Sequence, residues 1–135
     1  RRLNDGMGQY IARQVVKLMI NKSISIHKSN VLILGITFKE NCPDIRNSKV
    51  IDIYNELKSF NINIDVHDPW ADYNECKNEF GIELKKEIDS NYDGIILAVS
   101  HFEFKNYKYR QILNKDGLIY DVKGFLDEKI THARL

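Results

Sequence analysis

The sequence predicts an α/β fold: a three-layer α/β/α sandwich around a parallel sheet of about five strands, preceded by a long N-terminal helix. Short apolar runs rich in β-branched residues recur at 31–34, 94–99 and 117–120, and such runs are typical of strands buried on both faces of a parallel sheet. Amphipathic segments alternate with these runs, as the crossovers between parallel strands require. The 135 residues are enough for one domain with a sizeable core.

Composition excludes several classes of protein. Hydrophobic residues make up 43% of the chain and charged residues 29%, which is ordinary for a globular domain. With 20 Lys and Arg against 19 Asp and Glu, neither nucleic acid nor a lipid surface is expected as a partner, and no apolar run is long enough to cross a membrane. Cys42 and Cys76 form no C-x-x-C pair, so we expect no metal or redox site and a location in the reducing cytoplasm.

The first segment, residues 3–20, carries apolar residues at helical spacing and predicts a long amphipathic helix. Gly6 and Gly8 would each weaken this helix by about 1 kcal/mol relative to alanine. We therefore expect a packing reason for them, such as close approach of another helix. A polar linker at 21–30 follows, and His27 within it is expected to be solvated.

The stretch 31–50 is the centre of the predicted fold. A buried strand ends at Gly35, an irregular polar loop runs to Asn47, and an amphipathic helix is predicted over 48–60. In open α/β sheets the loop after a strand lies at the carboxyl edge, where ligands bind. The helix that follows turns its positive N-terminus toward the ligand.

Two cations, Lys39 and Arg46, lie in this loop. Together with the glycine after the strand and the helix N-terminus, they would make an anion site of diphosphate size. Neither G-x-G-x-x-G nor G-x-x-x-x-G-K-[ST] is present, so the spacing alone names no ligand. The pattern is equally compatible with solvated loop charges that pair with Glu40 and Asp44.

A second strand is predicted over 61–66, and it leads to Asp68. An acidic residue at the tip of such a strand commonly contacts a ribose hydroxyl. Asp-Pro also starts turns, however, and on pattern alone we favour the alternative that Asp68 caps the next helix. That helix is predicted over 71–80, with a brief extended piece at 81–84.

The third strand, 94–99, ends at Ser100 and His101, so His101 is expected at the same carboxyl edge. Contact with a ligand is one role for this histidine. A structural role at the start of the next helix is the alternative that the pattern favours, because Phe102 and Phe104 beside it are typical packing residues.

A helix predicted over 106–113 leads to the last strand, 117–120, after which Lys123 supplies a third cation. Alone, Lys123 would be interpreted as a surface lysine. Parallel strands deliver their carboxyl ends to one edge of a sheet, so we expect it to converge with Lys39 and Arg46 there. Residues 125–135 are expected to form a short tail.

The run G-I-T-F-K-E-N-C-P-D-I-R-N-S, which starts at Gly35, resembles the signature G-x-x-F-K-x-[ND]-x-x-D-x-R-x-S. This signature belongs to the C-terminal domain of the UDP-glucose/GDP-mannose dehydrogenase superfamily. More narrowly, the chain resembles the branch that oxidises UDP-N-acetylhexosamines for bacterial surface polysaccharide. The resemblance extends over nearly the whole chain, includes the D-P-W run from Asp68, and implies a Rossmann-like fold.

The resemblance also implies roles for individual residues. Phe38 and Lys39 match the positions that contact the UDP-sugar, and Lys123 matches a basic position, often arginine, that helps to hold the substrate nucleotide. A lysine there keeps the charge but loses the bidentate geometry of arginine. Arg46 matches the arginine that reaches NAD bound on another domain. At the same edge, the further candidates for ligand contact are Gly35, Asp68 and His101.

The family resemblance further implies a piece of a longer enzyme. Residues 1–25 would be the end of a central helix that connects the domains and forms a homodimer contact, and 26–135 the UDP-sugar-binding C-terminal domain. The family oxidises a sugar C6 alcohol to the acid in two steps, with two NAD and a catalytic cysteine upstream of the part present here. Cys42 lacks the neighbours of that cysteine, so we expect the chain itself to bind one nucleotide and to catalyse nothing.

One alternative of a different class remains open. The chain would then be a free-standing Rossmann-like nucleotide-binding or protein-interaction module, with its N-terminal helix as the partner surface. The resemblance does not say which UDP-sugar is oxidised, because the residues that read the sugar mostly belong to the part of the enzyme that is not present.

Overall fold

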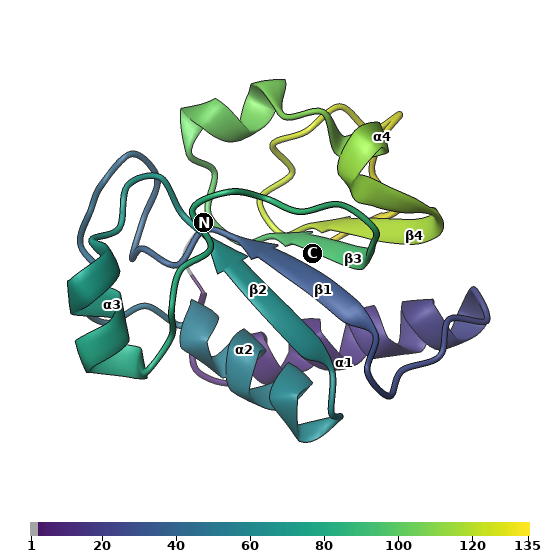
Figure 1. Cartoon of the computed structure of the whole chain (residues 1–135), viewed down its shortest axis with the longest axis horizontal. Helices are drawn as coiled ribbons and strands as arrows, with labels where there is room; N and C mark the ends of the chain where they lie inside the picture. Colours follow the sequence, from purple (N-terminus) through teal and green to yellow (C-terminus); the bar gives the residue numbers. More distant parts are fainter. Residues whose placement is uncertain (1–2) are drawn as a thin grey trace.

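The computed structural model describes residues 3–135 and contains one five-stranded sheet (Figure 1). The strands are β1 Asn30–Leu34, β2 Asn63–His67, β3 Tyr92–Leu97, β4 Leu113–Asp121 and β5 Ala133–Arg134. All neighbours pair in parallel, in the order β2-β1-β3-β4-β5. The predicted α/β fold with a parallel sheet is therefore confirmed.

The strand order reverses between β1 and β3. From β1 the chain crosses to β2 on one side and then returns to β3 on the other. Leu34, at the end of β1, is in register with His67 of β2 and Leu97 of β3. The loops that leave these three strands therefore start side by side at the carboxyl edge, and such a switch point is where open α/β sheets bind ligands.

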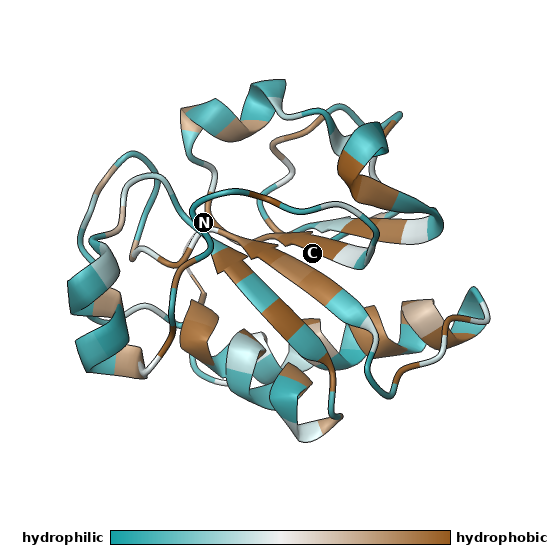
Figure 2. Ribbon diagram, viewed as in Figure 1, coloured by the Kyte–Doolittle hydropathy of each residue, from teal (hydrophilic) through white to brown (hydrophobic). Residues whose placement is uncertain are grey.

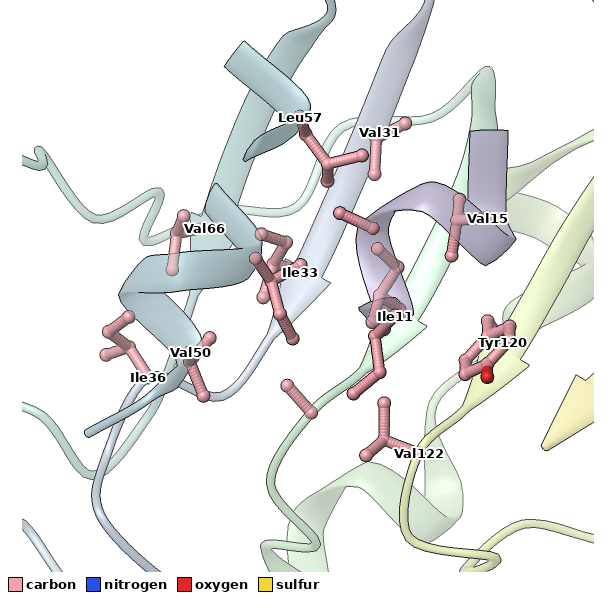
Figure 3. Close-up of a cluster of buried hydrophobic side chains, with 14 of the residues drawn as sticks. Ile11, Val15, Val31, Ile33, Ile36, Val50, Leu57, Val66, Tyr120 and Val122 are labelled. Carbon is pink, nitrogen blue, oxygen red and sulfur yellow. The ribbon is translucent and has the colours of Figure 1, made fainter. Parts of the chain in front are cut away.

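One face of the sheet is covered by α1 Met7–Asn21 and α2 Val50–Ser59 (Figure 1). Their apolar faces pack on the sheet in one large core, in which Ile11 and Val15 of α1 lie opposite Tyr120 and Val122 (Figure 3). The central strand β1 is apolar after its first residue, whereas β2 alternates between polar and apolar residues (Figure 2). In β1, the side chains of 31–34 are 0% exposed, because both faces of the strand are covered.

The two glycines of the first segment have different explanations. A Cβ atom at Gly8 would lie 2.6 Å from the Asp52 Cβ of α2, so the expected close approach of another helix is confirmed there. Gly6 has no neighbour within 4 Å of that position, but its φ is +84°. Because this conformation is left-handed, α1 begins at Met7 rather than at the predicted residue 3.

The other face carries shorter elements: the 3₁₀ helix η1 Phe102–Asn106 and the four-residue α4 Tyr109–Ile112. The irregular segment 81–91 passes the edge strand β2, to which the Lys85 N–H donates, and its buried Ile82 and Leu84 belong to the first core. The single helix predicted over 106–113 is wrong in extent. Tyr107 is extended (φ −70°, ψ 147°) and separates two short helical turns, while the Tyr109 hydroxyl donates to the Phe104 carbonyl at 2.5 Å. Both aromatic side chains bury against the sheet in a second core.

The C-terminal residues form a strand that the sequence did not indicate. His132 and Ile119 exchange two hydrogen bonds: the His132 N–H donates to the Ile119 carbonyl at 2.9 Å, and the Ile119 N–H donates to His132 Nδ1 at 2.9 Å. Arg134 Nη2 donates to the Leu126 carbonyl at 2.6 Å. These contacts align β5 on β4, so the expected tail at 125–135 supplies the fifth strand. The extended piece at 81–84 is not a strand.

Candidate functional site

The loop between β1 and α2, residues 35–49, lies at the carboxyl edge of the sheet and contains no helix or strand. It folds back on itself because the Phe38 N–H donates to the Asp44 carbonyl at 2.7 Å. The Asp44 carboxylate then accepts the Arg46 N–H at 2.9 Å. These bonds give the loop a defined shape in which Phe38 is half-buried while Lys39 and Arg46 are exposed.

Gly35 joins the loop to β1 at a point of close packing. A Cβ atom there would lie 2.5 Å from the Val99 Cβ, and the φ of Gly35 is +96°. Its N–H donates to the His67 carbonyl at 2.9 Å. Gly35 is buried, so its observed role is to let the chain pass between the ends of β2 and β3.

Asp68 lies directly beneath the start of the loop. Its Oδ2 accepts the N–H groups of Ile36 at 2.7 Å and Thr37 at 3.2 Å, and its Oδ1 accepts those of Trp70 at 2.7 Å and Ala71 at 3.1 Å. Its side chain is fully buried. Asp68 therefore shapes two loops at once.

Asp68 does not cap the next helix. The helix α3 Tyr73–Phe80 is capped by Asp72, whose side chain accepts the Glu75 N–H at 2.8 Å. Burial alone would raise the pKa of Asp68. The hydrogen bond from His101 and those from the Ile36 and Trp70 amides outweigh it, so this pKa lies below its usual value and the carboxylate is ionised.

His101 is also fully buried and completes the same network. Its Nε2 lies 3.0 Å from Asp68 Oδ2 and 3.1 Å from Thr37 Oγ1, and its Nδ1 accepts the Asn41 N–H at 3.0 Å. The Trp70 ring stacks on the imidazole at a centroid distance of 5.8 Å. Sequence reasoning missed Thr37 and Asn41, because polar loop residues carry no periodic signal that distinguishes them from solvated ones.

A similar arrangement shapes the loop after β4. The buried side chain of Asp121 accepts the Lys123 N–H at 3.2 Å and the Leu126 N–H at 2.7 Å, and Gly124 takes a φ of +63°. Asp121 was missed as well; it is the last residue of β4, whereas Asp68 comes directly after the last residue of β2. In both loops, a buried carboxylate at the strand's carboxyl end collects backbone N–H groups.

The structure brings Phe38 and Lys123 together. Both line a hollow of about 20 Å³, which is bordered also by Thr37, Ser48, Lys49 and Val50 at the start of α2. A volume of this size holds about one water molecule, so the hollow is too small for a nucleotide, and we call its lining residues one wall of the candidate site.

Lys39 lies near the same wall. The pKa of the Glu40 carboxyl is lowered mainly by a hydrogen bond to its own backbone. Burial opposes this as the second-largest effect, and the charges of Lys123 and Lys39 each lower the pKa by a smaller amount. Both lysines are therefore close enough to Glu40 to interact with it, and the two cations share this part of the edge.

Arg46 lies on a different hollow, of about 700 Å³, which is lined also by Asp44, Trp70, Asp72 and Glu75. Its Nε and Nη2 donate to the two oxygens of Asp44, both at 3.0 Å, and the hydrogen bonds from Arg46 lower the pKa of Asp44 to about 2. Its side chain is 80% exposed. Lys123 and Arg46 thus line two different hollows, which have no lining residue in common.

The described residues, 3–135, contain no cluster of three or more His, Cys, Asp or Glu side chains able to hold a metal ion. Within the same range, no helix has the length and apolar character needed to cross a membrane.

Comparison with known proteins identifies close relatives. The model of a family described as "UDP-glucose/GDP-mannose dehydrogenase family, UDP binding domain" matches residues 32–128. A UDP-N-acetyl-D-glucosamine 6-dehydrogenase from Pseudomonas aeruginosa is 47% identical over 139 residues, and Protein CapL from Staphylococcus aureus is 40% identical over 141 residues. Both alignments cover 100% of this chain but 33% of the relative, so the chain spans about one third of their length.

Solved structures resemble the chain in fold. An NDP-N-acetyl-D-galactosaminuronic acid dehydrogenase from Methanosarcina mazei Go1 superposes with a TM-score of 0.81 at 20% identity, over 94% of this chain and 27% of that one. A UDP-D-ManNAc dehydrogenase from Pyrococcus horikoshii gives a TM-score of 0.78 at 17% identity, over 97% of this chain and 31% of that one. At identities of 17% and 20%, this likeness supports the fold alone.

Proposed function

The chain belongs to the UDP-glucose/GDP-mannose dehydrogenase family, and on that premise we propose that it is the UDP-sugar-binding domain of an NAD-dependent nucleotide-sugar 6-dehydrogenase. The complete enzyme would oxidise the C6 alcohol of a UDP-N-acetylhexosamine to the uronic acid for surface polysaccharide synthesis. The names of the relatives that cover the whole chain support this substrate class.

The observation that carries the proposal is the convergence of Phe38, Lys39 and Lys123 at one wall of the carboxyl edge. They come from the ends of β1 and β4, and the first residues of α2 border the same wall. Two ammonium groups and a helix N-terminus favour a diphosphate. Phe38 offers an aromatic surface beside it. We propose that Lys39 and Lys123 bind the diphosphate and that Phe38 lines the sugar or nucleotide subsite.

NAD is the second small molecule in this proposal, and it would accept the hydride from C6. Arg46 fits a peripheral contact to it, since its guanidinium is 80% exposed on the hollow beside Trp70 while Asp44 fixes its orientation. The rest of the cofactor site and the catalytic cysteine would belong to an N-terminal domain. In this chain, the hollow with Arg46 would face that domain and the wall with Lys123 would face the substrate.

The domain boundaries follow the same proposal. Residues 1–25 would be the end of a connecting helix, and 26–135 the UDP-sugar-binding domain. Tyr10 and Ile20 support a homodimer contact through this helix, because their side chains on α1 are 52% and 58% exposed. An enzyme with a cytoplasmic nucleotide-sugar substrate would work in the cytoplasm.

Calorimetric titration of the full-length protein with UDP, and in parallel with UMP, GDP and NAD, tests the substrate site. Lys39→Ala and Lys123→Ala should each weaken UDP binding by about 1–3 kcal/mol, while Lys17→Ala on the exposed side of α1 should leave it unchanged. If UDP binds equally to all variants, the wall is not the diphosphate site. Reduction of NAD with UDP-N-acetylhexosamines, measured on the same protein, tests the reaction separately.

A further inference from the structure

One buried side chain, the imidazole of His101, contacts the loop on both sides of Lys39. Before Lys39, Thr37 Oγ1 lies 3.1 Å from His101 Nε2 and itself donates to the Lys39 carbonyl at 3.0 Å. After Lys39, the Asn41 N–H donates to His101 Nδ1 at 3.0 Å. The imidazole therefore spans the bend 37–41, at whose centre Lys39 lies.

The hydrogen bonds assign one protonation state to the ring. A nitrogen that accepts an N–H carries no proton, so the proton of neutral His101 is on Nε2 and not on Nδ1. This N–H lies between Asp68 Oδ2 at 3.0 Å and Thr37 Oγ1 at 3.1 Å. Nδ1 thus accepts a hydrogen bond from Asn41, which follows Lys39, and Nε2 donates toward Thr37, which precedes it.

The contact with Asn41 is reciprocal. Its side-chain Oδ1 accepts the N–H of Phe102, the residue after His101, at 3.0 Å. The φ of Asn41 is +53°, a left-handed conformation that asparagine adopts more readily than most residues. Two hydrogen bonds therefore join the loop to the end of β3 at this point.

His101 cannot contact a bound nucleotide directly in this structure, because its side chain is 0% exposed and lies against the Trp70 and Phe104 rings. Its effect on a ligand must pass through the loop. A lysine side chain is long and flexible, so the position of its backbone decides which ligand atoms the ammonium can reach.

We propose that His101 is a positioning residue for the diphosphate contact: its neutral imidazole, bonded to the Thr37 hydroxyl on one side of Lys39 and to the Asn41 N–H on the other, fixes where the Lys39 ammonium meets the UDP-sugar. This inference rests on the proposed function, in which Lys39 binds the diphosphate.

A double-mutant cycle in the full-length protein tests it. His101→Gln keeps a donor near the Nε2 position but removes the acceptor for the Asn41 N–H. We expect it to weaken UDP binding, and to raise the KM for UDP-N-acetylglucosamine, by about two- to tenfold, with a smaller change in kcat. In the Lys39→Ala background the same substitution should have little further effect, because residues that act through one another are not additive.

A matched control is His132→Gln, which removes the same kind of bond, from a backbone N–H to Nδ1, but directly before β5. It should leave UDP affinity unchanged. Should His101→Gln fail to fold, the cycle is repeated with His101→Asn, which keeps the acceptor for Asn41 and loses the donor to Thr37. In the Lys39→Ala background, His101→Asn should likewise have little further effect on UDP binding, since Thr37 also bonds to the Lys39 carbonyl.

Two outcomes would overturn the inference and leave the proposed function intact: unchanged UDP affinity in the His101 variants, or an equal loss with and without Lys39. If Lys39→Ala by itself leaves UDP binding unchanged, the role of Lys39 in the proposed function fails, and the positioning role fails with it.

Discussion

Gly8 on α1 lies so close to α2 that a Cβ atom on it would be 2.6 Å from the Cβ of Asp52 and 3.1 Å from the backbone N of Ile53. The two helices can share one face of the sheet at this distance only because Gly8 has no side chain. A helix interior otherwise favours alanine over glycine by about 1 kcal/mol. Packing overrides that preference here.

Gly8→Ala should therefore lower the free energy of unfolding, by about 1–3 kcal/mol, because the added methyl group forces the helices apart. Urea denaturation followed by circular dichroism measures this change. Lys17→Ala, at an exposed position of the same helix, serves as the control and should shift the value by less than about 0.5 kcal/mol. A higher free energy of unfolding for Gly8→Ala than for the wild type would contradict the close contact between α1 and α2.

The buried carboxylate of Asp68 predicts that the free energy of unfolding depends on pH in the acidic range. Its pKa in the folded protein lies below the ordinary 3.8, so its contribution is complete above about pH 4–5 and is lost as the pH falls through the folded-state pKa. Asp68→Asn should cost about 2–4 kcal/mol at pH 7, because an amide cannot accept on both sides as the carboxylate does.

The difference in stability between wild type and Asp68→Asn should shrink as the pH is lowered from 7 to 2.5, since the wild-type carboxyl then becomes protonated. Urea denaturation at a series of pH values measures it. A difference that stays constant over this range would show that the ionised form of Asp68 is not what holds the loop.

His132 predicts a separate effect nearer neutral pH. Burial, aided by the charge of Lys22, lowers the pKa of His132 below 6.5, and its unprotonated Nδ1 accepts the Ile119 N–H. In the unfolded chain this histidine binds a proton at higher pH, so stability should fall as the pH drops below about 6.5. NMR titration of the His132 ring should give a pKa below 6.5.

Lys123→Arg tests the geometry of the second cation. A guanidinium keeps the charge of the lysine and can bind a phosphate through two N–H groups, so UDP affinity should stay equal or rise up to about tenfold. Calorimetry with UDP, run beside Lys123→Ala, checks the direction. A clear loss of affinity in the arginine variant would mean that the wall accepts only the narrower ammonium.

Much of the fold could be predicted because strands that are buried on both faces appear in the sequence as runs of apolar residues. The segments at 31–34 and 94–97 are apolar throughout, since both faces of a parallel strand are covered, and so β1 and β3 were located. The strand β5 could not be found in this way. It has two residues, and its pairing depends on a ring nitrogen of His132 and on backbone groups that have no pattern.

The sequence could predict where the candidate site lies, but not which of its polar side chains contact one another. Strand ends and the family signature indicated Phe38, Lys39 and Lys123. Phe38 and Lys123 line one hollow at this edge, and Lys39 and Lys123 both act on the Glu40 carboxyl, while the contact of all three with a ligand stays a prediction. For Asp68 and His101 the sequence left two roles open, because it does not tell whether a polar side chain faces solvent or the interior. Their mutual contact at 3.0 Å with 0% exposure depends on the strand order β2-β1-β3, which brings residues 33 positions apart together.

The short strand β5 has a consequence for whether the edge of the sheet can pair with a strand of another copy of the chain. A parallel sheet has two edges, and each exposes backbone groups that can recruit a strand from another chain. On one side, the Lys85 N–H already occupies the Val66 carbonyl of β2 at 2.7 Å. On the other, β5 and His132 pair with β4, whose residues 117–120 are apolar and buried. A chain that stopped before His132 would leave β4 as a bare edge, and it should form concentration-dependent aggregates visible by light scattering while the intact chain does not.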